Sequence, residues 1–141
     1  MAEIKHQIPI DATSAKVYSA LTTQAGLQSW WTTDADVEER IGGKAVYGFE
    51  RRGMVFRMKT EKLEPEKLVV WSCSGDHPEW AGTMLTWTIS SEGGKTVLRF
   101  TQSGWKSISE FCTECNTSWG ELMHRIKGYS EGKTPGPLWK E

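Results

Sequence analysis

The stretch that decides the fold runs from Ser107 to Ser130 and reads SISEFCTECNTSWGELMHRIKGYS. Its apolar residues recur every three or four positions, so at about 100° per residue they fall on one stripe of a helix. Those residues are Ile108, Phe111, Cys112, Cys115, Trp119, Leu122, Met123, Ile126 and Tyr129. Ser107 with Glu110 forms a capping-box pattern that predicts the helix start, and Gly132 with Pro135 predicts its end. The stretch therefore predicts a long amphipathic helix whose apolar stripe needs a partner.

The sequence before this helix changes to a period of two, which is typical of strands with one buried face. The predicted strands span residues 3–10, 44–50, 52–61, 67–74, 83–89 and 96–102. Two short helices are predicted after the first strand. Thr13 is a good N-cap for the first, and Thr22 or Thr23 starts the second, which runs into Trp30 and Trp31.

This order of elements predicts an α+β fold. A helix with one apolar stripe and a sheet with one apolar face must each bury that surface. The simplest arrangement lays the helix across a curved antiparallel sheet. The 141 residues fit one domain of ordinary size, so we expect a single domain spanning 1–141.

The composition excludes several classes of function. The net charge is −1 and basic and acidic residues alternate, so nothing favours nucleic acid or an acidic membrane as a partner. No apolar run is long enough for membrane insertion, and the first residues, MAEIKHQIPI, lack the features of a secretory signal. We therefore expect a cytoplasmic protein whose three cysteines are reduced.

Cys112 and Cys115 have the CxxC spacing, which fits a redox pair, half of a zinc site or two small buried residues. A redox pair is disfavoured because a helix capped by Ser107 places Cys112 in its second turn, where the dipole effect has faded. A zinc site would also need Cys73 and His77, and His77 lies in a loop that is expected to be exposed. The stripe favours buried thiols. We therefore expect no metal and no cofactor, with Cys73, His77, Cys112 and Cys115 as the alternative zinc set.

No catalytic residue can be nominated from the sequence. His6 lies on a strand, His77 in a loop and His124 on the polar side of the helix, and no partner can be placed for any of them. The chain has no GxSxG, HExxH or P-loop motif.

The aromatic residues are more informative, because the chain has eight tryptophans, each able to bury about 150–250 Å². Two interpretations are open: the rings fill the core, or they line an apolar cavity that has a few polar groups. Rings from five positions are expected between sheet and helix: Trp31, Phe56, Trp87, Phe100 and Trp119. Tyr47, Gln102 and Arg57 are the candidate polar groups, although Arg57 alternates toward the outside of its strand.

Five segments, in order along the chain, carry a family resemblance. They are IPIDATSAKVYSALTTQAGLQSWW (8–31), RIGGKAVYGF (40–49), HPEWAGTMLTWTI (77–89), KTVLRFTQSGW (95–105) and SWGELMHRIKGYSEGK (118–133). Together they resemble the START-like (SRPBCC) superfamily, and within it the group related to activators of the heat-shock-protein-90 ATPase. Two positions differ from the usual pattern: Ser118 stands where members often have glycine, and Gln102 where many have histidine.

The resemblance implies the helix-grip (START/Bet v-like) fold, with a deep cavity between sheet and helix that often holds a hydrophobic small molecule. The residues expected to line it are Trp31, Tyr47, Phe56, Met58, Trp87, Phe100, Gln102, Cys112, Cys115, Trp119 and Met123. The first hypothesis is non-catalytic binding of a lipid, aromatic or polyketide-like molecule. The alternatives are a chaperone-regulating module of the stress response, acting through an exposed Trp80 loop or the Trp139 tail, and an enzyme of the cyclase or hydrolase kind.

Overall fold

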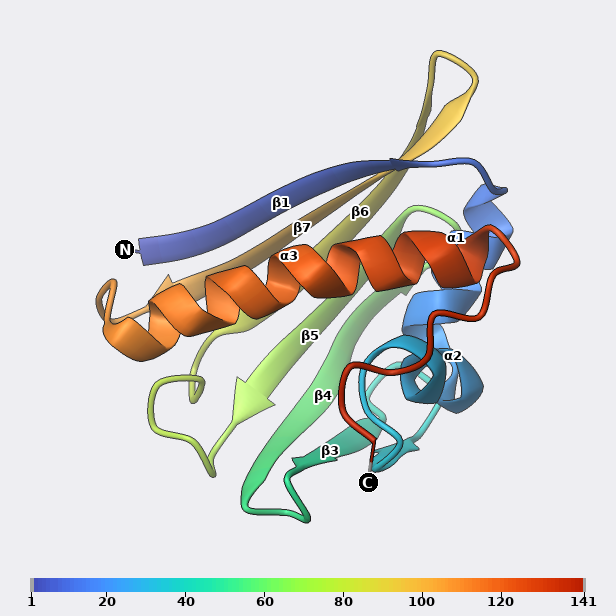
Figure 1. Cartoon of the computed structure of the whole chain (residues 1–141). Helices are drawn as coiled ribbons and strands as arrows, with labels where there is room; N and C mark the ends of the chain where they lie inside the picture. The colour runs from blue at the N-terminus through green and yellow to red at the C-terminus, as the bar shows by residue number, and fades with distance from the viewer. Residues whose placement is uncertain (1, 141) are drawn as a thin grey trace.

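The computed structural model describes residues 2–140, and its centre is a curved antiparallel sheet (Figure 1). The strand order is β1-β7-β6-β5-β4-β3-β2. The strands are β1 (Ala2–Ile10), β2 (Ala35–Val37), β3 (Lys44–Phe49), β4 (Met54–Glu64), β5 (Leu68–Ser74), β6 (Met84–Glu92) and β7 (Lys95–Trp105). Every neighbouring pair is antiparallel. The first strand lies at one edge of the sheet, where Pro9 is tolerated because it has no N–H to donate to a neighbouring strand.

Three helices complete the fold: α1 (Ser14–Thr22), α2 (Gln24–Trp30) and α3 (Glu110–Ser130). The sheet curves around α3, while α1 and α2 lie together at one end of α3 (Figure 1). Thr13 and Thr23 cap α1 and α2, as predicted, by accepting hydrogen bonds from the amides of Lys16 and Gly26. The predicted helix-grip architecture is confirmed.

The alternation seen in the sequence explains which faces are buried. On β6, Leu85, Trp87 and Ile89 are buried, whereas Thr88 between them is exposed. The stripe of α3 is buried through Trp119, Leu122, Met123 and Ile126, and it packs against the same core. The core therefore lies between the concave face of the sheet and α3.

The predicted start of the long helix is wrong by two residues. Ser109, not Ser107, is the N-cap of α3, because its hydroxyl accepts the amide of Cys112 at 3.0 Å. Glu110 is therefore the first helical residue rather than the third. Ile108 lies before the helix with 79% of its surface exposed, so it is not part of the buried stripe.

Two further segments differ from the prediction. Strand β2 was not predicted, because its three residues are too few to show a period of two; they pair with β3. The C-terminal tail also returns to the core, where the Trp139 amide donates to the Trp31 carbonyl at 3.0 Å. Within residues 2–140, no helix is long and apolar enough to span a membrane.

Candidate ligand-binding pocket

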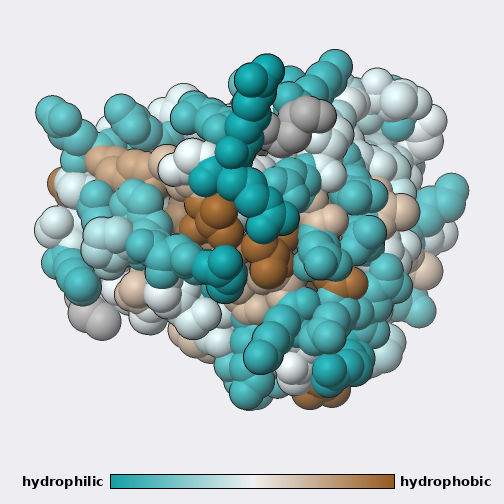
Figure 2. Space-filling view, turned by 90° about the horizontal axis from the view of Figure 1, so that it is seen from below, coloured by the Kyte–Doolittle hydropathy of each residue, from teal (hydrophilic) through white to brown (hydrophobic). Residues whose placement is uncertain are grey.

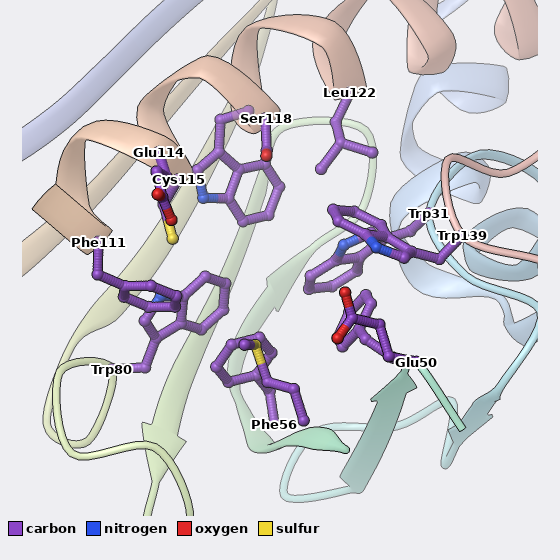
Figure 3. Close-up of a pocket in the computed structure, with 13 residues that line it drawn as sticks. Trp31, Glu50, Phe56, Trp80, Phe111, Glu114, Cys115, Ser118, Leu122 and Trp139 are labelled. Atoms are coloured by element: carbon purple, nitrogen blue, oxygen red, sulfur yellow. The ribbon is translucent and has the colours of Figure 1, made fainter. Parts of the chain in front are cut away.

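A pocket of about 170 Å³ lies between the N-terminal half of α3 and the β3–β4 hairpin. The loop before β6 and the C-terminal tail close two more of its sides (Figure 3). Its lining residues are Trp31, Phe49, Glu50, Met54, Phe56, Trp80, Phe111, Glu114, Cys115, Ser118, Trp119, Leu122 and Trp139. One side of α3 packs against β1, and the pocket lies on the opposite side of the helix.

Aromatic rings form most of the walls. Trp80 stacks on Phe56 with ring centroids 3.8 Å apart, and Trp119 lies 5.3 Å from Trp31. Phe49 joins the wall at Phe56 to the tail at Trp139, because its ring centroid lies 5.5 Å from that of Phe56 and 4.9 Å from that of Trp139. Rings that support one another in this way are rigid, so they hold the pocket open rather than collapsing into it.

Trp119, at the floor, is fixed by a buried hydrogen-bond relay. Its indole N–H donates to Gln102 Oε1 at 3.0 Å, and Gln102 Nε2 donates to the Thr83 hydroxyl at 3.1 Å. Thr83 in turn donates to the Trp80 carbonyl at 2.7 Å. Gln102 is fully buried and both ends of its amide have partners, so it orients Trp119 instead of facing the pocket.

The β3–β4 hairpin supplies Glu50 and is held by an ion pair at its tip. Arg52 donates to both carboxylate oxygens of Asp34 at 2.8 Å. Gly48 leaves room for this pair, since a Cβ at that position would come within 2.1 Å of Asp34 Oδ2. Glu50, Arg51 and Arg52 all have positive φ angles, 53° to 64°, a conformation that costs about 1–3 kcal/mol per non-glycine residue. The bidentate pair helps to maintain this tight tip.

The mouth of the pocket is acidic. Glu50 and Glu114 are exposed and lie on opposite sides, one on the hairpin and one on α3 (Figure 3). Ser118, half-buried on α3, faces the pocket between them. On the lower face of the molecule, a small group of hydrophobic residues is exposed and ringed by hydrophilic ones (Figure 2).

The pocket thiol is a weak nucleophile. Burial raises the pKa of Cys115 to about 11, and the carboxylates of Glu114 and Glu79 add to this rise. The Trp80 N–H, which has no nitrogen or oxygen acceptor among the described residues 2–140, favours the thiolate and offsets part of the shift. In the structure Cys112 lies in the first turn of α3, where the helix dipole favours a thiolate. Burial nevertheless raises the pKa of this thiol. The prediction that Cys112 lies in the second turn of the helix is therefore wrong. The raised pKa values of both thiols still disfavour a redox pair at neutral pH.

Four residues from the predicted cavity set line this pocket: Trp31, Phe56, Cys115 and Trp119. The others lie outside it in the packed core: Tyr47, Met58, Trp87, Phe100, Gln102, Cys112 and Met123. Trp87 and Phe100 are 4.3 Å apart and fill the space behind Trp119. Tyr47 packs on Trp31 at 4.4 Å, and burial raises the pKa of its phenol. Arg57 is exposed, as predicted, and pairs with Asp76.

Nine lining residues were not predicted: Phe49, Glu50, Met54, Trp80, Phe111, Glu114, Ser118, Leu122 and Trp139. Phe111 and Leu122 were visible in the helix stripe. Trp80 was expected in an exposed loop but has only 3% of its surface exposed. The Trp80 carbonyl and amide bond to Thr83 and His77, which folds the loop inward. Trp139 is half-buried against Phe49.

The histidines and the proposed zinc set do not form a site in residues 2–140. No three histidine, cysteine or acidic residues come together there in a way that fits a metal. His77 is half-buried rather than exposed and stacks on Phe111 at 4.1 Å. His6 Nε2 lies 2.9 Å from Asn116 Oδ1, and His124 is exposed, as predicted.

The chain is similar to a known protein family and to several solved structures. The family model described as "Activator of Hsp90 ATPase homolog 1-like protein" matches residues 11–131. The Aha1 dimer from Colwellia psychrerythraea, a solution structure, is 34% identical, with 93% of this chain and 97% of that chain covered and a TM-score of 0.85. No curated protein matches the chain.

More distant structures share the fold alone. MLL2253 from Mesorhizobium loti is 18% identical, with 89% of this chain and 94% of that chain covered and a TM-score of 0.79. CalU16 from Micromonospora echinospora is 20% identical, with 88% and 73% covered and a TM-score of 0.70.

Proposed function

The chain belongs to the family of activator of Hsp90 ATPase homolog 1-like proteins, and from that premise we propose that it binds a small aromatic or compact aliphatic molecule in the pocket beside α3. The observation that carries the proposal is a 170 Å³ space with predominantly aromatic walls and an open mouth. Apolar walls with a few polar groups at the rim are typical of small-molecule sites.

The size of the pocket limits the ligand. An engineered apolar cavity of about 150 Å³ in another protein stays dry and accepts benzene. A pocket of 170 Å³ therefore suits a molecule with one ring and a short substituent. Of the classes considered from the sequence, an aromatic molecule fits better than a long lipid chain or a fused polyketide, either of which would have to extend out of the mouth.

We infer binding rather than catalysis. A cyclase or hydrolase would need an acid, base or nucleophile directed at the ligand. The one thiol in the walls, Cys115, has its pKa raised by burial to about 11 and is therefore a poor nucleophile at neutral pH. The two carboxylates, Glu50 and Glu114, are exposed at the mouth and lie apart from each other.

A pocket-filling substitution tests the proposal. Ser118→Phe places a ring in the pocket, whereas Thr117→Phe places the same ring on the exposed side of α3. With tert-butylbenzene at ten times its Kd, the wild-type protein and Thr117→Phe should gain about 1.4 kcal/mol of stability, a rise in Tm of about 4 °C. Ser118→Phe should show no rise. Equal responses of the two variants, or none in the wild type, would count against the pocket as the site.

Regulation of an Hsp90-type chaperone is the second candidate. It is favoured by the 34% identity to a protein that is described as an Aha1 dimer. The contact expected from the sequence, an exposed Trp80, is not present, because Trp80 is buried. The test is the ATPase rate of the Hsp90 of the same organism with increasing amounts of this chain. A rate that does not change at saturating protein would exclude this role.

A further inference from the structure

We propose that the pocket selects a single-ring aromatic molecule that carries one oxygen acceptor, such as an aryl ketone, and that the Ser118 hydroxyl donates a hydrogen bond to this oxygen. The inference rests on the proposed function, because it names the class of ligand that the same pocket would hold. It follows from the place of Ser118 on α3, from the bonds that the hydroxyl groups of α3 make and from the kinds of polar group in the walls.

Ser118 lies in the middle of the part of α3 that lines the pocket. The other lining residues of the helix are Phe111, Glu114, Cys115, Trp119 and Leu122. Ser118 follows Cys115 by three residues and precedes Leu122 by four, so these side chains share one edge of the helix. The Ser118 side chain is half-buried, and its hydroxyl is directed from the helix toward the pocket (Figure 3). A ligand in the pocket would therefore contact this hydroxyl.

The hydroxyl groups on α3 differ in what they bind. The Thr113 hydroxyl donates to the Ser109 carbonyl at 3.0 Å, and the Thr117 hydroxyl donates to the Thr113 carbonyl at 3.4 Å. A bond of this kind, to a carbonyl one turn earlier, is a common way for a hydroxyl to be satisfied within a helix. The Ser118 hydroxyl makes no hydrogen bond to any of the described residues 2–140. It is therefore available to a ligand.

A ligand without a polar atom would cover this hydroxyl unfavourably. Filling the pocket displaces solvent from the half-buried Ser118 side chain, and a hydrocarbon offers no hydrogen bond in exchange. A hydroxyl that is covered by apolar atoms without a partner weakens the complex. A ligand oxygen beside Ser118 restores the lost bond. The pocket therefore discriminates between two ligands of the same shape by the bond that only one of them accepts.

The other polar side chains of the inner walls also favour an acceptor. Trp80 has only 3% of its surface exposed, and its indole N–H has no nitrogen or oxygen acceptor within residues 2–140. The Cys115 thiol keeps its proton at neutral pH, because burial raises its pKa to about 11. An indole N–H only donates, and a thiol is a weak donor. The lining carboxylates of Glu50 and Glu114 are exposed at the mouth, so the inner walls are complementary to an oxygen that accepts.

Two probes of matched shape test the inference. Acetophenone and α-methylstyrene differ only in whether an oxygen or a methylene group is double-bonded to the same carbon. Each has one ring and a short substituent, which suits the 170 Å³ space. Titrations followed by nuclear magnetic resonance of the probe give the Kd of each with the wild-type protein and its variants. If neither probe binds the wild-type protein, the proposed function itself fails.

A pair of neighbouring variants identifies the hydroxyl that is responsible. Ser118→Ala should raise the Kd of acetophenone about fivefold and leave that of α-methylstyrene within about twofold, because only the ketone loses a bond. Thr117→Ala removes a hydroxyl from the exposed side of α3 and should leave both Kd values within about twofold. Equal changes for the two probes in Ser118→Ala, or no change for either, would overturn the inference and leave the proposed function intact.

The carbonyl stretching frequency of bound acetophenone reports the bond itself. A hydrogen bond to the oxygen weakens the carbonyl double bond, so the band should lie at a lower frequency in the wild-type complex than in the Ser118→Ala complex. The difference between infrared spectra with unlabelled and isotope-labelled acetophenone separates this band from those of the protein. Bands at the same frequency in the two complexes would show that Ser118 does not donate to the ligand.

Discussion

Gln102 forms a buried relay that a histidine, the residue implied at this place by the family resemblance, could also form. Its amide accepts from the Trp119 indole and donates to Thr83, which a neutral imidazole can also do with its two nitrogens. Gln102→Leu should therefore cost about 1–3 kcal/mol of unfolding free energy, because two buried groups lose their partners. Gln102→His should cost clearly less at pH 8.

The pH dependence of the stability of Gln102→His shows whether the hydrogen-bond relay, and not only the packing of the side chain, stabilises the fold. A protonated imidazole cannot accept from Trp119, so folding lowers the pKa of that histidine. The unfolded state then binds more protons, and stability falls as the pH drops below about 6.5. Urea denaturation at pH 8 and pH 5.5 measures this. Equal costs for the leucine and histidine variants at pH 8 would contradict the relay.

Cys115 should react slowly with alkylating reagents although it is partly exposed. Burial raises its pKa from 9.0 to about 11, so the thiolate population and the rate with iodoacetamide at pH 8 should be about a hundredfold below those of an ordinary thiol. The rate should rise steadily between pH 8 and pH 11, and tert-butylbenzene should slow it further. Mass spectrometry locates the label, and rapid labelling at pH 8 would contradict the buried environment.

Glu131 joins the end of α3 to the segment after β1. Its side chain is only 11% exposed and accepts from Lys127 Nζ at 2.6 Å and from the Asp11 amide at 2.8 Å. The Lys127 bond and then the Asp11 amide lower the pKa of the carboxyl from 4.5. Glu131→Gln should cost about 1–2 kcal/mol at pH 7.

The sign of the pH effect at Glu131 is fixed by this lowered pKa. The stabilisation is complete above 4.5 and is lost as the pH falls through the lower pKa of the folded state. The difference between wild type and Glu131→Gln should therefore shrink in acid. A difference that stays constant from pH 7 to pH 3 would show that the charge of Glu131 is not the cause. Glu121→Gln, which breaks the exposed pair with Arg125, should cost less than about 1 kcal/mol throughout.

At the scale of the elements, the N-terminus of α3 is the clearest test. Ser109→Ala removes the acceptor of the Cys112 amide and should cost about 1 kcal/mol. Ser107→Ala changes an exposed residue before the helix and should stay within about 0.5 kcal/mol. Ser109 also donates to Glu79, so its loss should loosen the loop that carries Trp80. Chemical denaturation of the two variants decides which serine is the cap, and a larger cost at Ser107 would contradict the structure.

The sequence predicted those elements whose signals are local. Helix caps such as Thr13, the period of two in β6 and the stripe of α3 depend on neighbouring residues, so they can be read without the fold. Other features depend on distant contacts. Trp80 is buried because its loop folds onto Phe56. Trp139 is half-buried because the tail pairs with residues 31–33. No pattern within either segment shows where its tryptophan will pack.

The same reason explains why only some of the residues predicted to line a cavity surround the pocket. The alternation of residues along a strand identifies those that face inward, such as Phe56 and Trp87. It does not show whether other side chains fill the space opposite them. Trp87 meets Phe100 and is buried in solid core, whereas Phe56 meets Trp80 beside an open space. Whether an inward ring lines a cavity depends on the packing of the whole core.

At the scale of the whole molecule, the pocket follows from the way α3 is placed. The helix packs against β1 on one side and against α1 and α2 near its end, so its opposite side faces the β3–β4 hairpin across a wider space. Large rigid rings line this space without filling it. The placement of α3 therefore provides the pocket, and the proposal that it binds a ligand rests on this space.

The most direct test of binding in this pocket is a nuclear magnetic resonance titration of the indole N–H signals with tert-butylbenzene. Of the eight tryptophans, Trp31, Trp80, Trp119 and Trp139 line the pocket and should shift most. Trp30, Trp71, Trp87 and Trp105 lie outside it and should shift least, and Ser118→Phe should abolish the pattern. Shifts spread over all eight signals, or the same shifts in Ser118→Phe, would contradict a ligand site beside α3.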